Sequence, residues 1–135
     1  MNLIEKVSGF LDKIKKEDIA EQSSASSRNK NVSSNKKINS FLYINENIIK
    51  EARELEKKFK KGRLYGKVIG VKSNINVKGM PVSCASKTLE AYKGSYDATV
   101  IEKIKKEDGL IIGILNMDEF AAGWSGETSD FGPTQ

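Results

Sequence analysis

The chain contains no histidine, a single cysteine and only two prolines among its 135 residues. Without histidine it lacks the commonest general base, which excludes Ser-His-Asp and Cys-His catalytic arrangements and metal sites built on histidine. Cys84 has no second cysteine to pair with, as is typical of proteins from reducing compartments. Acid–base chemistry near neutral pH would therefore depend on a carboxylate, Cys84, a tyrosine or a lysine with a shifted pKa.

Long apolar runs are also missing. No stretch approaches the roughly 20 residues needed to span a bilayer. The N-terminal segment MNLIEKVSGFLDKIKKEDIAEQ lacks the continuous apolar core of a signal peptide. These features predict a cytoplasmic protein, and a length of 135 residues with 38% hydrophobic residues is enough for one domain with a modest core.

The charge balance is mildly basic. Lys and Arg total 23 against 18 Asp and Glu, a formal net charge of +5, with lysine-rich runs at 13–16, 36–37 and 57–61. Such a balance allows nucleic acid as a partner, although interleaved charges on a solvated surface explain it as simply. The chain also lacks an interleaved aromatic platform. A non-catalytic basic RNA-binding module is therefore an alternative function.

Hydrophobic spacing predicts helices and strands that alternate along the chain. Residues 1–20 are expected to form an N-terminal amphipathic helix, and residues 21–37, rich in Ser, Asn and Lys, a flexible linker. The elements expected after it are a strand at 38–44, a helix at 48–60 ending before Gly62, a strand at 64–72, a helix from an Asp97 N-cap to Gly109, a strand at 110–115, a short helix at 117–121 and a loop at 123–135. A strand, a crossover helix and a second strand make a β-α-β unit, which predicts an α/β fold.

The segment KVIGVKSNINVKGMPVSCAS, residues 67–86, places Lys72 at the end of an apolar strand. Lysine normally has a pKa of about 10.4, but burial disfavours its charged form and can lower the pKa by several units. Such a neutral lysine can take a proton from a serine hydroxyl. The alternative is a lysine whose side chain extends from the strand end into solvent.

Other candidate residues have simpler explanations. With no histidine to activate it, Cys84 is more typical of an inert, buried thiol than of a nucleophile. Asp118 and Glu119 follow a buried strand, where acidic residues suit a helix N-terminus, although a catalytic carboxylate is the alternative. The loop at 123–135 follows the carboxyl end of a strand, the edge at which α/β sheets bind ligands.

Several stretches taken together resemble the amidase signature family. They are GVKSN at 70–74, CASKTLE at 84–90, YDATV at 96–100, NMDEFA at 116–121 and FGPT at 131–134. The resemblance covers residues 38–135, and within the family it is closest to the glutaminase (A-type) component of aspartyl/glutamyl-tRNA amidotransferases of archaeal type. It implies the amidase signature fold, a mixed β-sheet core covered by helices on both faces, of which residues 38–135 would form the N-terminal part.

The resemblance also implies a reaction. The family uses a Ser–cis-Ser–Lys triad in which Lys72 would be the neutral base, acting through a bridging serine on a nucleophilic serine that attacks the side-chain amide of glutamine. Gly123, Trp124 and Ser125 would lie beside this substrate. Ammonia would pass to a partner, the B subunit, which uses ATP and Mg²⁺ to amidate misacylated Glu-tRNA(Gln) or Asp-tRNA(Asn), while a small C subunit would hold the complex together. No residue of this chain is expected to bind a cofactor or a metal.

The chain departs from the family pattern at several points. Ser73 stands where many members have Asp, and Trp124 stands where a small residue is common. The family carries both triad serines in a Gly/Ser-rich segment downstream of FGPT, and these 135 residues do not contain it. We therefore expect a fragment of a longer protein that is inactive alone; the alternative is a pseudo-subunit. A free-standing amidase acting on small amides is a further alternative within the family.

Overall fold

The computed structural model describes residues 2–18 and 38–135, so the linker predicted at 21–37 lies outside the described residues. The elements in chain order are α1 (Leu3–Glu17), β1 (Phe41–Ile44), α2 (Ile48–Glu56), β2 (Val68–Lys72), the 3₁₀ helix η1 (Lys87–Leu89), α3 (Thr99–Lys106), β3 (Leu110–Leu115) and the 3₁₀ helix η2 (Glu119–Ala121). Within the two described ranges, no helix has the length and apolar character needed to cross a membrane.

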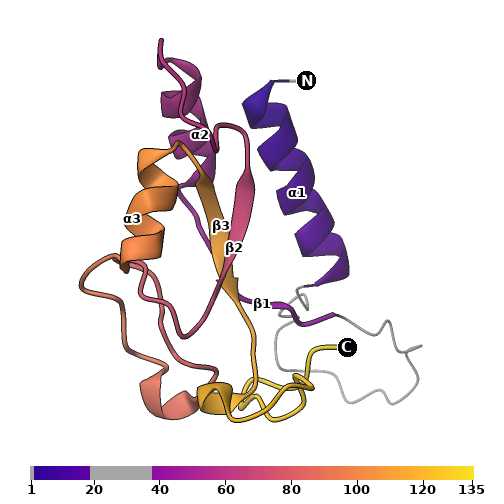
Figure 1. Cartoon of the computed structure of the whole chain (residues 1–135). Coiled ribbons are helices and arrows are strands. Elements are labelled where there is room, and N and C mark those ends of the chain that lie inside the picture. Colours follow the sequence, from indigo (N-terminus) through magenta and orange to yellow (C-terminus); the bar gives the residue numbers. More distant parts are fainter. Residues whose placement is uncertain (1, 19–37) are drawn as a thin grey trace.

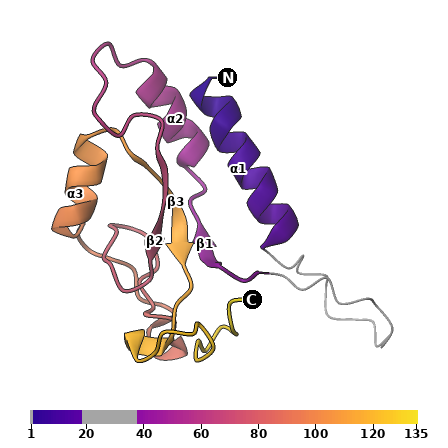
Figure 2. The ribbon, with the colours of Figure 1, turned by 45° about the vertical axis from the view of Figure 1, so that its right-hand side comes forward.

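The sheet has three strands in the order β1-β3-β2. β3 is the middle strand, antiparallel to β1 and parallel to β2. Because α3 connects the parallel neighbours β2 and β3, the predicted β-α-β unit is confirmed. Figures 1 and 2 show α1 and α2 on one side of the sheet and α3 on the other. The prediction of an α/β fold with a mixed sheet and helices on both faces is therefore confirmed.

Two hydrophobic clusters hold the helices to the sheet. The buried members of the first, which joins α1 and α2 to one face, are Leu3, Val7, Ile48, Ala52, Leu110 and Ile112. Those of the second, which joins α3 to the other face, are Val71, Val77, Ile101, Ile111 and Ile114. The predicted amphipathic face of α1 thus packs into the same core as α2, and the helix begins with a capping box between Asn2 and Glu5.

A bulge in β3 decides which side chains reach which cluster. Strict alternation along a strand would place Ile114 on the same face as Leu110 and Ile112. The pairing with β2 shifts between Ile69 and Gly70, so Ile112 is an extra residue on β3. Such an extra residue changes the face on which the following side chains lie, and Ile114 therefore joins the α3 cluster.

The helix predicted at 48–60 ends earlier, at Glu56. Phe59 was expected on its buried side, but its side chain is fully exposed, at 106%. Asp108 gives the reason: its buried carboxylate accepts hydrogen bonds from Lys58 Nζ at 2.5 Å and from the Gly62 N–H at 2.7 Å, which directs the chain away from the helix axis. The hydrogen bond from Lys58, followed by that from Gly62, holds the pKa of Asp108 below its usual value.

The prediction that Asp97 caps α3 is wrong. The N-cap residue is Ala98, and no side chain caps this helix. Asp97 instead accepts hydrogen bonds from the Lys78 N–H at 2.7 Å and from Lys105 Nζ at 2.7 and 2.9 Å. It therefore ties the loop after β2 to the last turn of α3 rather than to its first turn.

Candidate functional site

The candidate site lies at the carboxyl ends of β2 and β3, at the lower end of the ribbon in Figure 1. The chain after each strand is joined to the other here. The Ser73 N–H donates to the carbonyl of Leu115 at 3.2 Å, and the Cys84 N–H donates to the carbonyl of Ser73 at 3.0 Å. Segments that are more than 40 residues apart in the sequence therefore meet at this edge, which is the edge at which α/β sheets bind ligands.

Lys72 is the last residue of β2, as predicted, and its side chain is exposed. The described residues leave this side chain accessible to solvent, and its role as a base stays a prediction. Just beyond it, Ser73 Oγ and Asn76 Oδ1 are buried without a hydrogen-bond partner in the described part of the chain. Leaving such groups unpaired costs about 1–3 kcal/mol each, so this turn has unused hydrogen-bonding capacity next to Lys72.

The backbone at this edge is strained at two pairs of residues, and this strain could not be predicted from the sequence. Cys84 and Ala85 have φ of 51° and 55°, and Phe120 and Ala121 have φ of 50° and 60°. The left-handed region costs a residue other than glycine roughly 1–2 kcal/mol, and such strain gathers at functional sites. The strained pairs touch each other, since the Phe120 N–H donates to the carbonyl of Cys84 at 2.9 Å.

Asp118 organises the loop that follows η2. It is the N-cap residue of η2, at the helix start that the sequence predicted, but its side chain makes no capping hydrogen bond. Its buried carboxylate accepts instead from the N–H of Gly126 at 2.9 Å and from the N–H and Oγ1 of Thr128 at 3.0 and 2.8 Å. These hydrogen bonds, from Gly126 first and then Thr128, hold the pKa of Asp118 below its usual value.

Two asparagine side chains hold the FGPT segment in place. Asn116 Nδ2 donates to the carbonyls of Asn39 at 3.1 Å and Gly132 at 3.0 Å, while Asn116 Oδ1 accepts from Ser129 Oγ at 2.6 Å. Asn39 Nδ2 donates to the carbonyl of Gly132 at 3.0 Å. The segment after β3 is thereby attached to the chain that enters β1.

The predicted substrate-side residues lie in the loop that Asp118 holds. Gly123, Trp124 and Ser125 are all exposed, and Trp124 is exposed at 100%. A side chain at position 123 would place its Cβ 2.8 Å from Asp118 Cγ, so this close approach requires glycine. The fold brings these three residues to the same edge of the sheet as Lys72. Within residues 2–18 and 38–135, no hydrogen bond joins any of the three to Lys72. Their contact with substrate stays a prediction.

Replacing Asp118 with Asn is expected to loosen this loop. The amide NH₂ would face one of the backbone N–H donors, so at least one hydrogen bond is lost and a donor is left unpaired. Amide protection factors at Gly126 and Thr128, measured by hydrogen exchange in the full-length protein, should fall about tenfold or more. Because the folded pKa is lowered, the ionised carboxylate stabilises the loop above the usual Asp pKa of 3.8, and protection in the parent should fall as the pH drops below it. Equal protection in both proteins would contradict this role.

Comparison with known proteins identifies the family to which the chain belongs. The sequence profile of the family described as Amidase matches residues 24–135. The A subunit of glutamyl-tRNA(Gln) amidotransferase from Methanococcus vannielii is 51% identical over 136 residues, which cover 98% of this chain and 27% of that protein. Its counterpart from Methanothermobacter thermautotrophicus is 61% identical over 105 residues, 74% of this chain and 23% of that protein. The chain thus spans about a quarter of the length of the curated relatives it matches.

Solved structures agree with these matches. The A subunit of glutamyl-tRNA(Gln) amidotransferase from Thermotoga maritima superposes with a TM-score of 0.62 at 38% identity, covering 73% of this chain and 20% of that one. The peptide amidase of Stenotrophomonas maltophilia superposes with a TM-score of 0.77 at 19% identity, covering 100% of this chain and 26% of that one, and it supports the fold alone. The chain belongs to the amidase family, as its motifs predicted.

Proposed function

We propose that this chain is part of the glutamine-hydrolysing subunit of a tRNA-dependent amidotransferase. The observation that carries the proposal is the identity of 48–61% to relatives named for the A subunit of glutamyl-tRNA(Gln) amidotransferase. A family member named for another activity, the peptide amidase, shares only 19% identity. The names of the relatives favour Glu-tRNA(Gln) over Asp-tRNA(Asn) as the acceptor. The strained backbone at Cys84–Ala85 and Phe120–Ala121 and the loop held by Asp118 support a catalytic site at this edge of the sheet.

In the proposed reaction Lys72 is the base. A neutral Lys72 Nζ accepts a proton from a bridging serine, which in turn takes the proton of the nucleophilic serine hydroxyl. The serine oxygen attacks the side-chain amide carbon of glutamine, ammonia leaves with a proton returned through the same chain, and water then hydrolyses the acyl-enzyme to glutamate. Both serines would come from a part of the polypeptide that these 135 residues do not include.

The exposure of Lys72 defines what the rest of the protein must do. A lysine exposed to water is cationic near neutral pH and cannot accept a proton. We propose that the remainder of the polypeptide covers this edge and excludes water from Lys72, because a desolvated lysine is the form that can act as a base. The neighbouring Ser73 and Asn74 are uncharged, so they do not add a carboxylate that would favour the ammonium form.

Partner subunits would complete the pathway. Ammonia would pass to the B subunit, which would bind ATP and Mg²⁺ and amidate the tRNA-attached glutamate, and a small C subunit would hold the assembly together. No residue described here is assigned to ATP or to Mg²⁺. A cytoplasmic location follows from this role in translation.

The test uses the full-length polypeptide assembled with its partner subunits. We expect ammonia release from glutamine, and with ATP, Mg²⁺ and Glu-tRNA(Gln), formation of Gln-tRNA(Gln). Propionamide and a C-terminal peptide amide are the comparison substrates. Rapid hydrolysis of these amides without hydrolysis of glutamine would replace the proposal with a free-standing amidase.

A further inference from the structure

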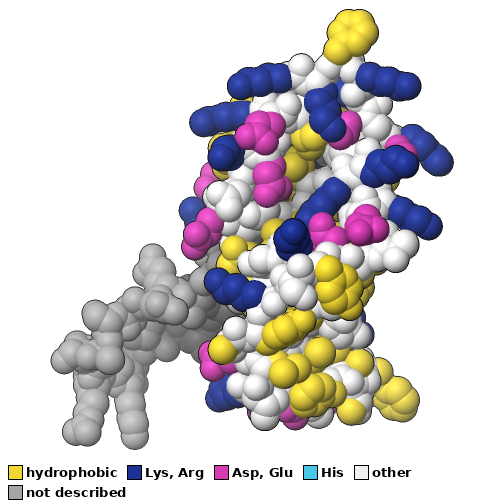
Figure 3. Space-filling model, turned by 90° about the vertical axis from the view of Figure 1, so that its left-hand side faces the viewer, with side chains coloured by type: hydrophobic (Ala, Val, Ile, Leu, Met, Phe, Trp, Pro, Cys, Tyr) yellow, Lys and Arg dark blue, Asp and Glu magenta, His cyan; other side chains and the backbone are white. Residues whose placement is uncertain are grey.

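A surface of positive charge lies at the end of the sheet opposite the candidate site. Figure 3 views the molecule from the α3 side and shows most of the Lys and Arg side chains in its upper half, with Asp and Glu side chains among them, and hydrophobic side chains toward its lower end. Two segments contribute exposed cations to this region, the stretch 57–67 between α2 and β2 and the last turn of α3. We name it the basic surface and define it by Lys57, Lys60, Lys61, Arg63, Lys103 and Lys106.

The acidic groups near the basic surface are fewer than its cations. The stretch KKFKKGRLYGK at 57–67 contains no Asp or Glu. The carboxylate of Asp108 is buried and is paired with Lys58 and the Gly62 N–H. Glu107 accepts the Arg63 backbone N–H at 2.9 Å, so part of its acceptor capacity is already used. Among the residues that line the adjacent groove, three are cations and one, Glu107, is acidic, so an excess of positive charge remains there.

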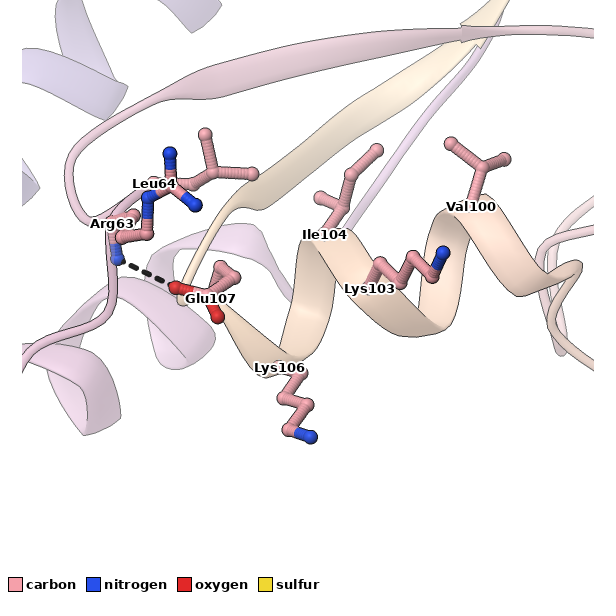
Figure 4. Close-up of a pocket in the computed structure, with 7 residues that line it drawn as sticks. All are labelled: Arg63, Leu64, Val100, Lys103, Ile104, Lys106 and Glu107. Atoms are coloured by element: carbon pink, nitrogen blue, oxygen red, sulfur yellow. Dashed lines mark hydrogen bonds between the residues drawn. The ribbon is translucent and has the colours of Figure 1, made fainter.

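The cations surround a groove rather than a flat face. The groove has a volume of about 570 Å³ and runs between the residues before β2 and one side of α3. Figure 4 shows Arg63 on one wall and Lys103 on the other, with Lys106 pointing away from Arg63. Leu64, Val100 and Ile104 form its apolar floor. Cations on both sides of a groove of this kind suit a polyanion whose charges repeat along a chain.

Phe59 adds an aromatic ring to the same region. It lies between Lys58 and Lys60 and is exposed at 106%, so it contributes nothing to the core. An aromatic ring presented among lysines is the combination that binds single-stranded nucleic acid, by base stacking together with phosphate contacts. A membrane surface would favour a broad apolar face, whereas the apolar faces of α1 and α2 are used in the core.

We propose that the basic surface binds the phosphate backbone of RNA, with Phe59 stacking on an unpaired base. The choice of RNA over an acidic protein rests on the proposed function, because an enzyme that modifies a tRNA-attached amino acid has an RNA within reach. The surface lies at the amino ends of β2 and β3, whereas Lys72 and the loop at 123–125 lie at their carboxyl ends. Binding here is therefore separate from glutamine hydrolysis.

Matched charge variants of the full-length assembled protein test this proposal. The variant Lys60→Gln/Lys103→Gln/Lys106→Gln removes exposed cations of the basic surface without touching the Lys58–Asp108 pair or the contact of Lys61 with the Tyr65 ring. The control Lys13→Gln/Lys15→Gln/Lys16→Gln removes the same charge from the far end of α1. Each variant takes two lysines from the last turn of a helix, which matches their effects on helix stability.

The measurement is the affinity for tRNA(Gln) as a function of salt. The basic-surface variant should bind at least about tenfold more weakly at ~50 mM salt, and its log–log salt slope should be smaller by about 2–3. The control should bind as the parent does. Phe59→Ala should weaken binding of a single-stranded RNA about fivefold or more and leave binding of a duplex unchanged.

Several results would overturn the proposal. They are unchanged tRNA affinity in the basic-surface variant, an equal loss in the control, or binding to vesicles containing phosphatidylserine, or to an acidic peptide, in place of tRNA. Glutamine hydrolysis without tRNA is measured in parallel and should be unchanged in both variants. Absence of glutaminase activity in the parent would instead count against the proposed function, so the two failures are distinguishable.

Discussion

Replacing Lys72 with Met in the full-length assembled protein is expected to reduce kcat/KM for glutamine hydrolysis about a thousandfold or more. Methionine has similar length but cannot accept a proton, so the bridging serine would have no base. Because the Lys72 side chain is exposed at the end of β2, its replacement removes no packing from the described core. Methionine also keeps the volume of the side chain at an edge that we propose is covered in the full-length protein, so thermal unfolding should be nearly unchanged while hydrolysis is lost.

The variant Lys72→Arg distinguishes two roles of Lys72, a proton-accepting base and a permanent positive charge. The guanidinium stays protonated at all relevant pH values, so a base would be lost as completely as in Lys72→Met. If Lys72→Arg keeps substantial activity, the lysine acts as a cation that binds substrate, and the proposed mechanism is wrong. Lys93→Met is the matched control, because Lys93 is also exposed and its pairing with Pro81 involves only the backbone. This control should retain the parent's rate.

Replacing Gly113 with Val is expected to destabilise the protein by about 3 kcal/mol or more, or to prevent folding. Gly113 lies in the middle strand, and a Cβ there would be 2.2 Å from the Tyr43 carbonyl oxygen and 3.1 Å from a carbon of the Phe41 ring. The obstacle is backbone of the neighbouring strand, which cannot rotate away as a side chain can. Pairing of β1 with β3 would have to open, which would also disturb the carboxyl ends of the strands that carry the site.

Gly9→Ala is the opposite case and serves as the control. Gly9 lies inside α1, and nothing lies within 4 Å of the position its Cβ would take. Alanine there should stabilise the protein by roughly 0.5–1 kcal/mol, because glycine is unfavourable in a helix interior. Chemical denaturation of the two variants beside the parent measures both effects. A Gly113→Val protein as stable as the parent would show that the β1–β3 contact is not as close as described.

Much of the fold could be predicted from the sequence because it depends on local pattern. The apolar residues of α1 recur at helical spacing, and the uniformly apolar run at 110–115 predicts a buried element. A helix that connects two apolar strands of one sheet predicts that the two strands are parallel. The family could be predicted from the order of several short motifs, and the comparisons confirm it. Lys72 could be placed at a strand end for the same reason.

The site could be predicted only in outline. Its location at the carboxyl ends of β2 and β3 follows from topology, and the predicted loop at 123–135 is where the fold places it. The left-handed backbone of Cys84 and Ala85 could not be predicted, since neither residue type prefers that conformation. It is imposed by hydrogen bonds from Phe120 and Asp130, which lie more than 30 residues away.

The acidic residues show where sequence patterns alone are insufficient. Asp97 and Asp118 each precede a predicted helix, and either position predicts a helix cap equally well, because a carboxylate before a helix suits the helix dipole. The partners that each one actually has, Lys105 for Asp97 and the Gly126 and Thr128 amides for Asp118, are brought to it by the folded chain. Elements were thus determined by hydrophobic periodicity, which is local. Hydrogen-bond partners, the end of α2 and the exposure of Lys72 were decided by tertiary structure, because each depends on distant residues competing for the same polar group or covering the same surface.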